Sequence, residues 1–323
     1  MKAIVYNKYG SPDVLELKDV ARPAPKDHEV LVKVHAASIN SWDWDMICGS
    51  PFIVRLWGLF KPKYKIPGAD IAGIVETVGR HVKKFKPGDK VFGDLAECGF
   101  GAFAEYALAK EEALGFKSES MTFEQAACIP QAGMMALQSI RDKGEVQAGQ
   151  KVLINGAGGG VGTLALQIAK NFGAEVTCVD SFQKHEMLRA LGADHVIDYL
   201  REDFTRNGKR YELIIDVVSN RSLYDYTRSL SERGVFLMIG GTMSAILQAM
   251  LLGRWISEKE GKRYGILAYE ANNDLDFFNR LFESGKVVPV IDRCFSLKDT
   301  SEAFRYYSSG NVQGKIVIQV TSA

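Results

Sequence analysis

The sequence has almost no excess charge, few cysteines and no long apolar run. Its 40 lysines and arginines against 39 aspartates and glutamates leave a net charge of +1. It therefore lacks the cationic surplus that neutralises nucleic-acid phosphates, and we expect no nucleic-acid partner. No apolar run approaches the roughly 20 residues that span a bilayer, so we expect no membrane insertion. Asn7 and Lys8 interrupt the first apolar run, which excludes a secretory signal there.

The five cysteines are widely spaced and form no C-x-x-C pair. An odd count with this spacing is untypical of disulfide frameworks and of cysteine-rich zinc sites. Reduced thiols and the absent signal lead us to expect a cytoplasmic protein. Glycine, by contrast, is plentiful at 31 of 323 residues, which predicts frequent tight turns.

The pattern of the chain changes near residue 124. The first part contains short strand-like runs between Gly and Pro, which indicate a mainly β domain: 3–6, 30–37, 72–78 and 90–93. The second part alternates strands (151–155, 175–179, 195–198, 213–218, 235–239, 265–269) with helices (161–172, 184–191, 222–231). That alternation predicts a doubly wound parallel sheet. Strand-like runs return at 287–291 and 315–320. We predict an α/β protein with one domain of residues 1–123 and 285–323 and an inserted domain of 124–284.

A glycine-rich turn is the strongest local signal. It follows the strand at 151–155, opens an amphipathic helix, and consists of Gly158, Gly159, Gly160, Val161 and Gly162. Glycines permit close backbone approach, and the free N–H groups and positive dipole of a helix start suit a pyrophosphate. The turn therefore predicts a dinucleotide site.

The acidic residue after the next strand bears on the choice of dinucleotide. Asp180 lies 18 residues after Gly162, near the spacing expected for a ribose-binding carboxylate, which favours NADH. Ser181 and Lys184 point the other way, because both could hold the 2′-phosphate of NADPH. Asp180 could instead simply cap the following helix. The cofactor prediction is therefore NADPH or NADH.

Several motifs together resemble one known family. They are MKAIVYNKYGSPDVLEL, SINSWDWDMICG, IPGADIAGIVETVG, KPGDKVFG, INGAGGGVGTLALQIAK, GADHVIDY and GKIVIQV, in that order. The chain resembles the medium-chain dehydrogenase/reductase superfamily, in its zinc-free quinone oxidoreductase (zeta-crystallin-like) branch. The resemblance implies a GroES-like catalytic domain, an inserted Rossmann domain, and a homodimer joined through the strand at 263–269. It also implies cofactor contacts from Tyr199, Gly240, Gly241, Thr242, Asn311, Gly314 and Lys315.

The resemblance also bears on metal binding. Zinc-dependent relatives have a Cys where this chain has Asn40, and a His-Glu pair where it has Ala69-Asp70. A catalytic zinc needs about three protein ligands, so we expect no zinc. Asn40 and Asp43 match the Asn-x-x-Asp element of the zinc-free branch. Asn40 would donate its amide to a substrate oxygen, or would serve only as a turn-forming residue. Asp43 would orient the loop rather than face the developing negative charge.

The segment 50–66 is aromatic and basic. Phe52, Trp57, Phe60 and Tyr64 could stack on a flat substrate as a wall of the site. The alternatives are a loop that packs on the second domain and a membrane-surface segment with four Lys or Arg residues. No histidine has a recognisable catalytic context, so the reaction proton would come from solvent or from Tyr64.

These features favour a zinc-independent, NAD(P)H-dependent oxidoreductase that transfers hydride to quinones or α,β-unsaturated carbonyls. Conjugation spreads the developing charge, so such acceptors need less help from the site. Two alternatives stay open. One is a zinc-free alcohol dehydrogenase or carbonyl reductase, and the other is a nucleotide-sensing binding or scaffold protein without turnover.

Overall fold

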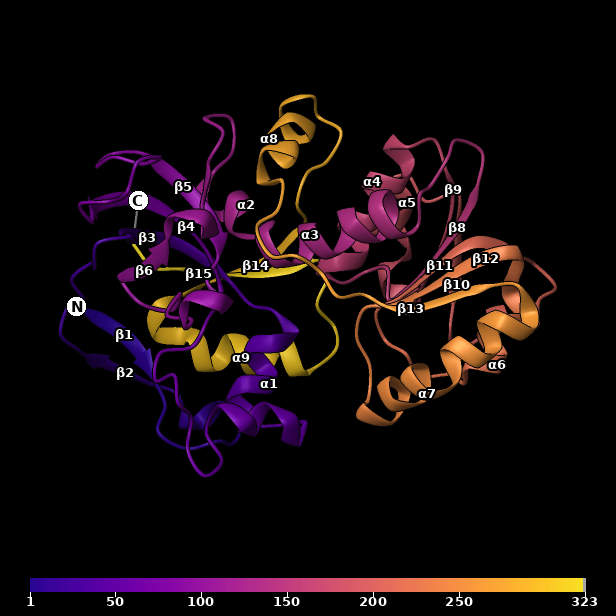
Figure 1. Cartoon of the computed structure of the whole chain (residues 1–323), viewed down its shortest axis with the longest axis horizontal. Helices are drawn as coiled ribbons and strands as arrows, with labels where there is room; N and C mark the ends of the chain where they lie inside the picture. The colour runs from indigo at the N-terminus through magenta and orange to yellow at the C-terminus, as the bar shows by residue number, and fades with distance from the viewer. Residues whose placement is uncertain (322–323) are drawn as a thin grey trace. The chain divides into compact units, whose positions relative to one another are not determined.

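The structure is a computed structural model that describes residues 1–321, without the side chains of Ile53, Trp57, Arg254 and Trp255. The chain forms two compact units (Figure 1). Unit 1 comprises Met1–Met134 and Glu270–Ala323, and unit 2 comprises Met135–Tyr269. No helix among residues 1–321 is both long and apolar enough to cross a membrane.

Unit 1 is built on a seven-stranded sheet of order β14-β15-β3-β4-β5-β7, in which β6 also pairs with β3. Its strands are β3 (Glu29–Ser38), β4 (Asp70–Val78), β5 (Lys90–Asp94), β6 (Tyr106–Lys110), β7 (Gly115–Phe116), β14 (Ile291–Ser296) and β15 (Lys315–Gln319). A separate hairpin pairs β1 (Lys2–Val5) with β2 (Glu16–Asp19). The late strand β15 pairs antiparallel with the end of β3, so the two ends of the chain complete one sheet.

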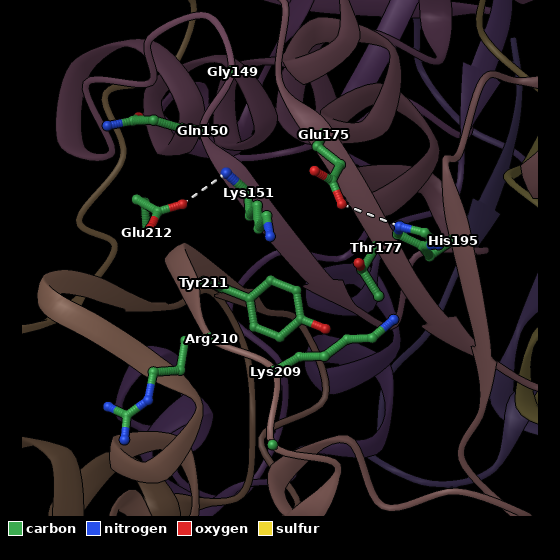
Figure 2. Close-up of a pocket in the computed structure, with 11 residues that line it drawn as sticks. Gly149, Gln150, Lys151, Glu175, Thr177, His195, Lys209, Arg210, Tyr211 and Glu212 are labelled. Atoms are coloured by element: carbon green, nitrogen blue, oxygen red, sulfur yellow. Dashed lines mark hydrogen bonds and ion pairs between the residues drawn. The ribbon is translucent and has the colours of Figure 1, made fainter.

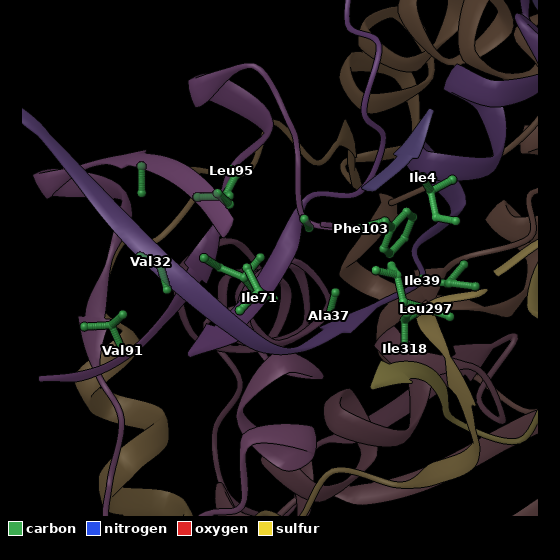
Figure 3. Packing of buried hydrophobic residues seen from close by; sticks show 14 of the residues in the cluster. Ile4, Val32, Ala37, Ile39, Ile71, Val91, Leu95, Phe103, Leu297 and Ile318 are labelled. Atoms are coloured by element: carbon green, nitrogen blue, oxygen red, sulfur yellow. The ribbon is translucent and has the colours of Figure 1, made fainter. Parts of the chain in front are cut away.

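The core of unit 1 consists of apolar side chains from strands at both ends of the chain (Figure 3). Ile4, Val32 and Ile71 pack there with Phe103 and Ile318, all of which are buried. The helices of this unit are α1 (Ser41–Cys48), α2 (Phe123–Ala127), α8 (Leu275–Glu283) and α9 (Thr300–Ser308), and α3 (Pro130–Leu137) leads into unit 2. Gly49 ends α1 in a left-handed conformation, with φ of 62°.

Unit 2 is a six-stranded parallel sheet of order β10-β9-β8-β11-β12-β13. The strands are β8 (Lys151–Asn155), β9 (Glu175–Asp180), β10 (His195–Asp198), β11 (Tyr211–Asp216), β12 (Leu230–Met238) and β13 (Arg263–Ile266). Helices α4 (Gly160–Asn171) and α5 (His185–Ala190) cover one face, and α6 (Leu223–Ser229) and α7 (Met243–Glu260) cover the other (Figure 1). The predicted doubly wound sheet is confirmed, and β8 and β11 lie where its strand order reverses.

The boundaries of the units differ from those expected from the sequence. Residues 124–134 and 270–284 belong to unit 1, although periodicity placed them in the inserted domain. Polar contacts between distant residues attach the segment 270–284 to unit 1. Asn272 accepts a hydrogen bond from the backbone N of Asp94 (2.7 Å) and donates one to its carbonyl (2.9 Å). Asn279 donates to the carbonyl of Phe116 (2.8 Å). The strand expected at 287–291 begins only at Ile291.

Candidate functional site

The glycine-rich turn of unit 2 joins β8 to α4 at the point where the strand order reverses. Open α/β sheets bind ligands at such points, beyond the carboxyl ends of the strands. A Cβ on Gly162 would lie 2.5 Å from backbone atoms of Gly156 and Ala157, so only glycine allows this packing. The first N–H groups of α4 have no acceptor within the helix and are available to an anion. The turn therefore fits a dinucleotide pyrophosphate.

Asp180 holds this turn in place. Its Oδ2 accepts a hydrogen bond from the backbone N of Gly158 (2.7 Å), and its Oδ1 accepts one from that of Ser181 (2.8 Å). The ammonium of Lys184 lies 3.3 Å from the same Oδ1, and both side chains are about nine-tenths buried. The expected ribose-binding residue is thus ion-paired with the expected 2′-phosphate-binding residue.

The other cofactor contacts expected in unit 2 lie at the same edge of the sheet. Gly240, Gly241 and Thr242 follow β12, and the hydroxyl of Thr242 caps α7 by accepting from the backbone N of Ala245 (3.2 Å). Gly241 has φ of 146°, and a Cβ there would lie 2.5 Å from that of Ser219. Tyr199 follows β10 and is largely exposed.

A cavity of about 700 Å³ lies at the opposite edge of the same sheet (Figure 2). Lys151, Glu175, His195 and Tyr211 line it, and each is the first residue of its strand. Among the lining residues, Nε2 of His195 lies 3.1 Å from Oε1 of Glu175. Since doubly wound sheets bind nucleotides at their carboxyl ends, this cavity is not the cofactor site.

Unit 1 contains a buried polar cluster at the end of β3. Asn40 precedes α1, and its side-chain amide donates a 2.9 Å hydrogen bond to Oδ2 of Asp70, the first residue of β4. The ammonium of Lys315, the first residue of β15, donates to Oδ1 of Asn40 (2.5 Å) and to the carbonyl of Ile39 (3.0 Å). It also lies 3.8 Å from Oδ2 of Asp70. All three side chains are at least nine-tenths buried.

These contacts determine the orientation of the Asn40 amide. Lysine has only donors and a carboxylate has only acceptors, so Oδ1 must face Lys315 and Nδ2 must face Asp70. One of the two Nδ2 hydrogens is used by Asp70. The other Nδ2 hydrogen is used by neither Asp70 nor Lys315. The neighbouring ammonium polarises the amide and makes that hydrogen a stronger donor.

Asp43 lies in the first turn of α1 and is completely buried. Its Oδ2 accepts a hydrogen bond from the backbone N of Asn40 (2.8 Å), and its Oδ1 has no partner among the described residues. Burial raises the pKa of this carboxyl to about 8. Asp43 is therefore mostly protonated at neutral pH. It positions the Asn40 backbone without adding negative charge.

Burial also raises the pKa of Asp70, while the neighbouring Lys315 ammonium acts in the opposite direction. Lysine and carboxylate here are both removed from water, and each depends on the other for compensation. The family resemblance led us to expect a cofactor contact from Lys315. In unit 1 its ammonium donates to Asn40 and to the carbonyl of Ile39. The GKIVIQV motif contained Lys315, but nothing in the sequence showed that it pairs with Asn40.

Zinc does not fit this cluster. The described residues contain no group of three His, Cys, Asp or Glu side chains that could hold a metal ion. At the Asn40 position the side chain is an amide, and the Asp70 carboxylate is already bound by Asn40 and by the backbone N of Gln131 (3.2 Å). A lysine ammonium supplies the positive charge there.

The remaining expected residues of unit 1 lie outside this cluster. Tyr64 packs on Phe100, with ring centres 5.3 Å apart, beside the buried Met46 and Val54. The side chain of Trp57 is outside the described ones. Before β15, Asn311 is exposed, and Gly314 has φ of 84° with no room for a Cβ beside Val290.

Comparisons with known proteins cover nearly the whole chain. A family model described as alcohol dehydrogenase GroES-like domain matches residues 26–119, and one described as zinc-binding dehydrogenase matches residues 191–318. The 2-methylene-furan-3-one reductase of Solanum lycopersicum is 34% identical over 334 residues, covering 98% of this chain and 79% of that protein. The chloroplastic NADPH-dependent alkenal/one oxidoreductase of Arabidopsis thaliana is 33% identical over 335 residues, with the same coverage. The solved quinone oxidoreductase of Coxiella burnetii has a TM-score of 0.88 and 32% identity, covering 99% of both chains.

Proposed function

The chain belongs to the medium-chain dehydrogenase/reductase superfamily and is an oxidoreductase with a nicotinamide cofactor; from this premise we propose that it reduces quinones or α,β-unsaturated carbonyls without zinc. The observation that carries the proposal is the Asn40–Asp70–Lys315 cluster. One N–H of its amide would be donated to a substrate oxygen, and the described residues contain no group of three His, Cys, Asp or Glu side chains that could hold a metal ion. The reductases and quinone oxidoreductases to which the chain is similar support the choice of acceptor.

The bound nicotinamide would supply the hydride, and the residues of the chain would do the rest. The Asn40 amide would donate to the acceptor oxygen, where negative charge develops. The Lys315 ammonium would strengthen that donor, and protonated Asp43 would hold the Asn40 backbone without opposing the charge. The Gly158–Gly162 turn would bind the pyrophosphate. Conjugated acceptors spread the charge, so a donor of this strength suffices without a Lewis acid.

The test is to treat the protein with EDTA, titrate it with NADH and NADPH, and assay a panel of quinones, enones and saturated aldehydes. We expect turnover only with the conjugated acceptors and no gain from added zinc. Asn40→Ala should lower kcat by roughly 100-fold, the usual effect of losing one such donor, with little change in cofactor affinity. Activity that requires zinc would refute the proposal, and so would tight cofactor binding without turnover on any acceptor.

We also propose a homodimer. β13 is an edge strand of the unit 2 sheet, and no described strand pairs with its outer side. Exposed edges are usually covered, and a second copy of β13 would cover this one. Sedimentation should give the mass of a dimer, and Ile266→Lys, which places charge on the edge, should shift it toward the monomer.

The unpaired thiols of the described residues support a reducing compartment such as the cytoplasm.

A further inference from the structure

Residues 46–69 contain no Asp or Glu, although the chain as a whole has 39. The same stretch contains Arg55, Lys61, Lys63 and Lys65. Residues 46–69 therefore carry a local surplus of positive charge, although the protein as a whole is nearly neutral. This surplus lies in one continuous surface segment of unit 1, between α1 and β4.

The segment is anchored to unit 1 at several points. Val54 is fully buried, and the hydroxyl of Tyr9 donates to the carbonyl of Gly58 (2.7 Å). The guanidinium of Arg55 donates to the carbonyl of Gly49 (2.9 Å) and lies 5.2 Å from the centre of the Tyr9 ring. These contacts fix which side chains face outward.

The outward side chains are large and apolar. Phe60 is 90% exposed, Leu56 is 73%, Phe52 is 65% and Leu59 is 50%. Lys61, Lys63 and Lys65 are exposed beside them, and none of the three pairs with a carboxylate among the described residues. We call Phe52, Leu56, Leu59, Phe60 and these three lysines the docking segment.

We propose that the docking segment binds the surface of an anionic lipid bilayer. Apolar side chains that face water beside unpaired lysines match the two attractions of a membrane interface, namely burial among acyl chains and the negative potential of acidic headgroups. A symmetric contact with a second copy is disfavoured, because it would bring both sets of lysines together. Binding to a bilayer requires neither cofactor nor acceptor, so it is independent of the proposed function.

The test is flotation of the protein with vesicles of phosphatidylcholine alone or with phosphatidylglycerol added. We expect binding only to the anionic vesicles, and weaker binding as salt rises. Replacing Lys61, Lys63 and Lys65 by Gln should lower the partition coefficient roughly 100-fold, at about fivefold per lysine near an anionic surface. Leu56→Ser with Phe60→Ser should lower it by a similar factor, because two large side chains no longer leave water.

Matched control variants make the same chemical changes elsewhere. Leu200 and Leu251 are 77% and 76% exposed and can be replaced together by Ser. The exposed Lys209, Lys286 and Lys298 can be replaced together by Gln. Both controls should bind anionic vesicles like the unaltered protein.

Three results would overturn the inference. One is equal binding to neutral and anionic vesicles. Another is an equal loss of binding in the control variants. The third is unchanged vesicle binding in the Leu56 and Phe60 variant together with a changed KM for a water-soluble acceptor or a changed oligomeric mass. That last result would assign the segment to the substrate or to a second copy.

Discussion

Replacing Asp43 by Asn should remove much of the pH dependence of the stability of unit 1. Asp43 is fully buried, and its carboxyl pKa is raised from the ordinary value near 3.8 to about 8. Between these values the unfolded chain has lost the proton and the folded chain keeps it. The stabilisation from the protonated side chain is therefore complete below about pH 3.8 and is lost as the pH rises through 8.

The magnitude follows from the same values. Each pH unit in this window changes the free energy of unfolding by about 1.4 kcal/mol through this one group. From pH 5 to pH 7, the unfolding free energy of Asp43→Asn should therefore rise by about 2.7 kcal/mol relative to the unaltered protein. The Asn side chain keeps an oxygen that accepts from the backbone N of Asn40, so the start of α1 should survive.

Urea unfolding followed by tryptophan fluorescence at several pH values measures this difference. Trp42 and Trp44 flank the substituted residue in unit 1. Contributions from other titrating groups cancel when the two proteins are compared at each pH. Asp276→Asn is the matched control, because it makes the same chemical change at an exposed position and should leave the pH profile unaltered. Parallel profiles for Asp43→Asn and the unaltered protein would refute the idea that Asp43 is buried and protonated.

Three further substitutions test the rest of the site. Gly162→Ala should weaken cofactor binding more than tenfold in calorimetry, because its Cβ meets backbone atoms at 2.5 Å. Gly253→Ala in α7 makes the same change outside the turn, where the Cβ meets nothing closer than 3.5 Å, and is the control; equal effects of the two substitutions would contradict this explanation. Asp180→Ala removes the ion-pair partner of the Lys184 ammonium. The ratio of NADPH to NADH affinity should therefore shift toward NADPH by roughly tenfold or more, the scale of one charge-assisted hydrogen bond. An unchanged ratio would show that this ion pair does not contact the ribose. Lys315→Met should destabilise unit 1 by about 3–5 kcal/mol in urea unfolding, because it leaves the buried Asp70 carboxylate without a counter-ion. It should also lower kcat. A loss of cofactor affinity alone would instead support the cofactor contact of Lys315 that the family resemblance implies.

The parts of the fold that depend on local pattern were predictable. Buried runs such as residues 151–155 and 175–179 alternate with an amphipathic helix, and this pattern is enough to predict a parallel sheet. The turn at Gly158–Gly162 was predictable because close packing there requires glycine. Most helix ends were off by a residue or two, since helix termini depend on capping contacts. The strands expected at 235–239 and 287–291 were off by more, because they begin at Leu230 and Ile291.

The parts that depend on contacts between distant residues were not predictable. Asn272 and Asn279 attach their segment to unit 1 by hydrogen bonds that no local pattern encodes. Asn40 was identified from its motif, but its orientation depends on Lys315 and Asp70. Likewise, the composition of residues 50–66 showed aromatic and basic character but not which side chains face water. That required the anchors at Val54 and Gly58.

The pairing of β15 with β3 has a consequence for how the protein is made. Asn40 and Lys315 are 275 residues apart in the chain. At a synthesis rate of about 5–20 residues per second, that separation corresponds to roughly 15–55 s. All six strands of unit 2 leave the ribosome in that interval. During the same time the end of β3, Ala36–Ser38, lacks the strand that will pair with it, because Val317–Gln319 of β15 have not yet been made. An open strand edge invites pairing with other chains, so a nascent chain would be most prone to aggregate while the inserted unit is already able to fold.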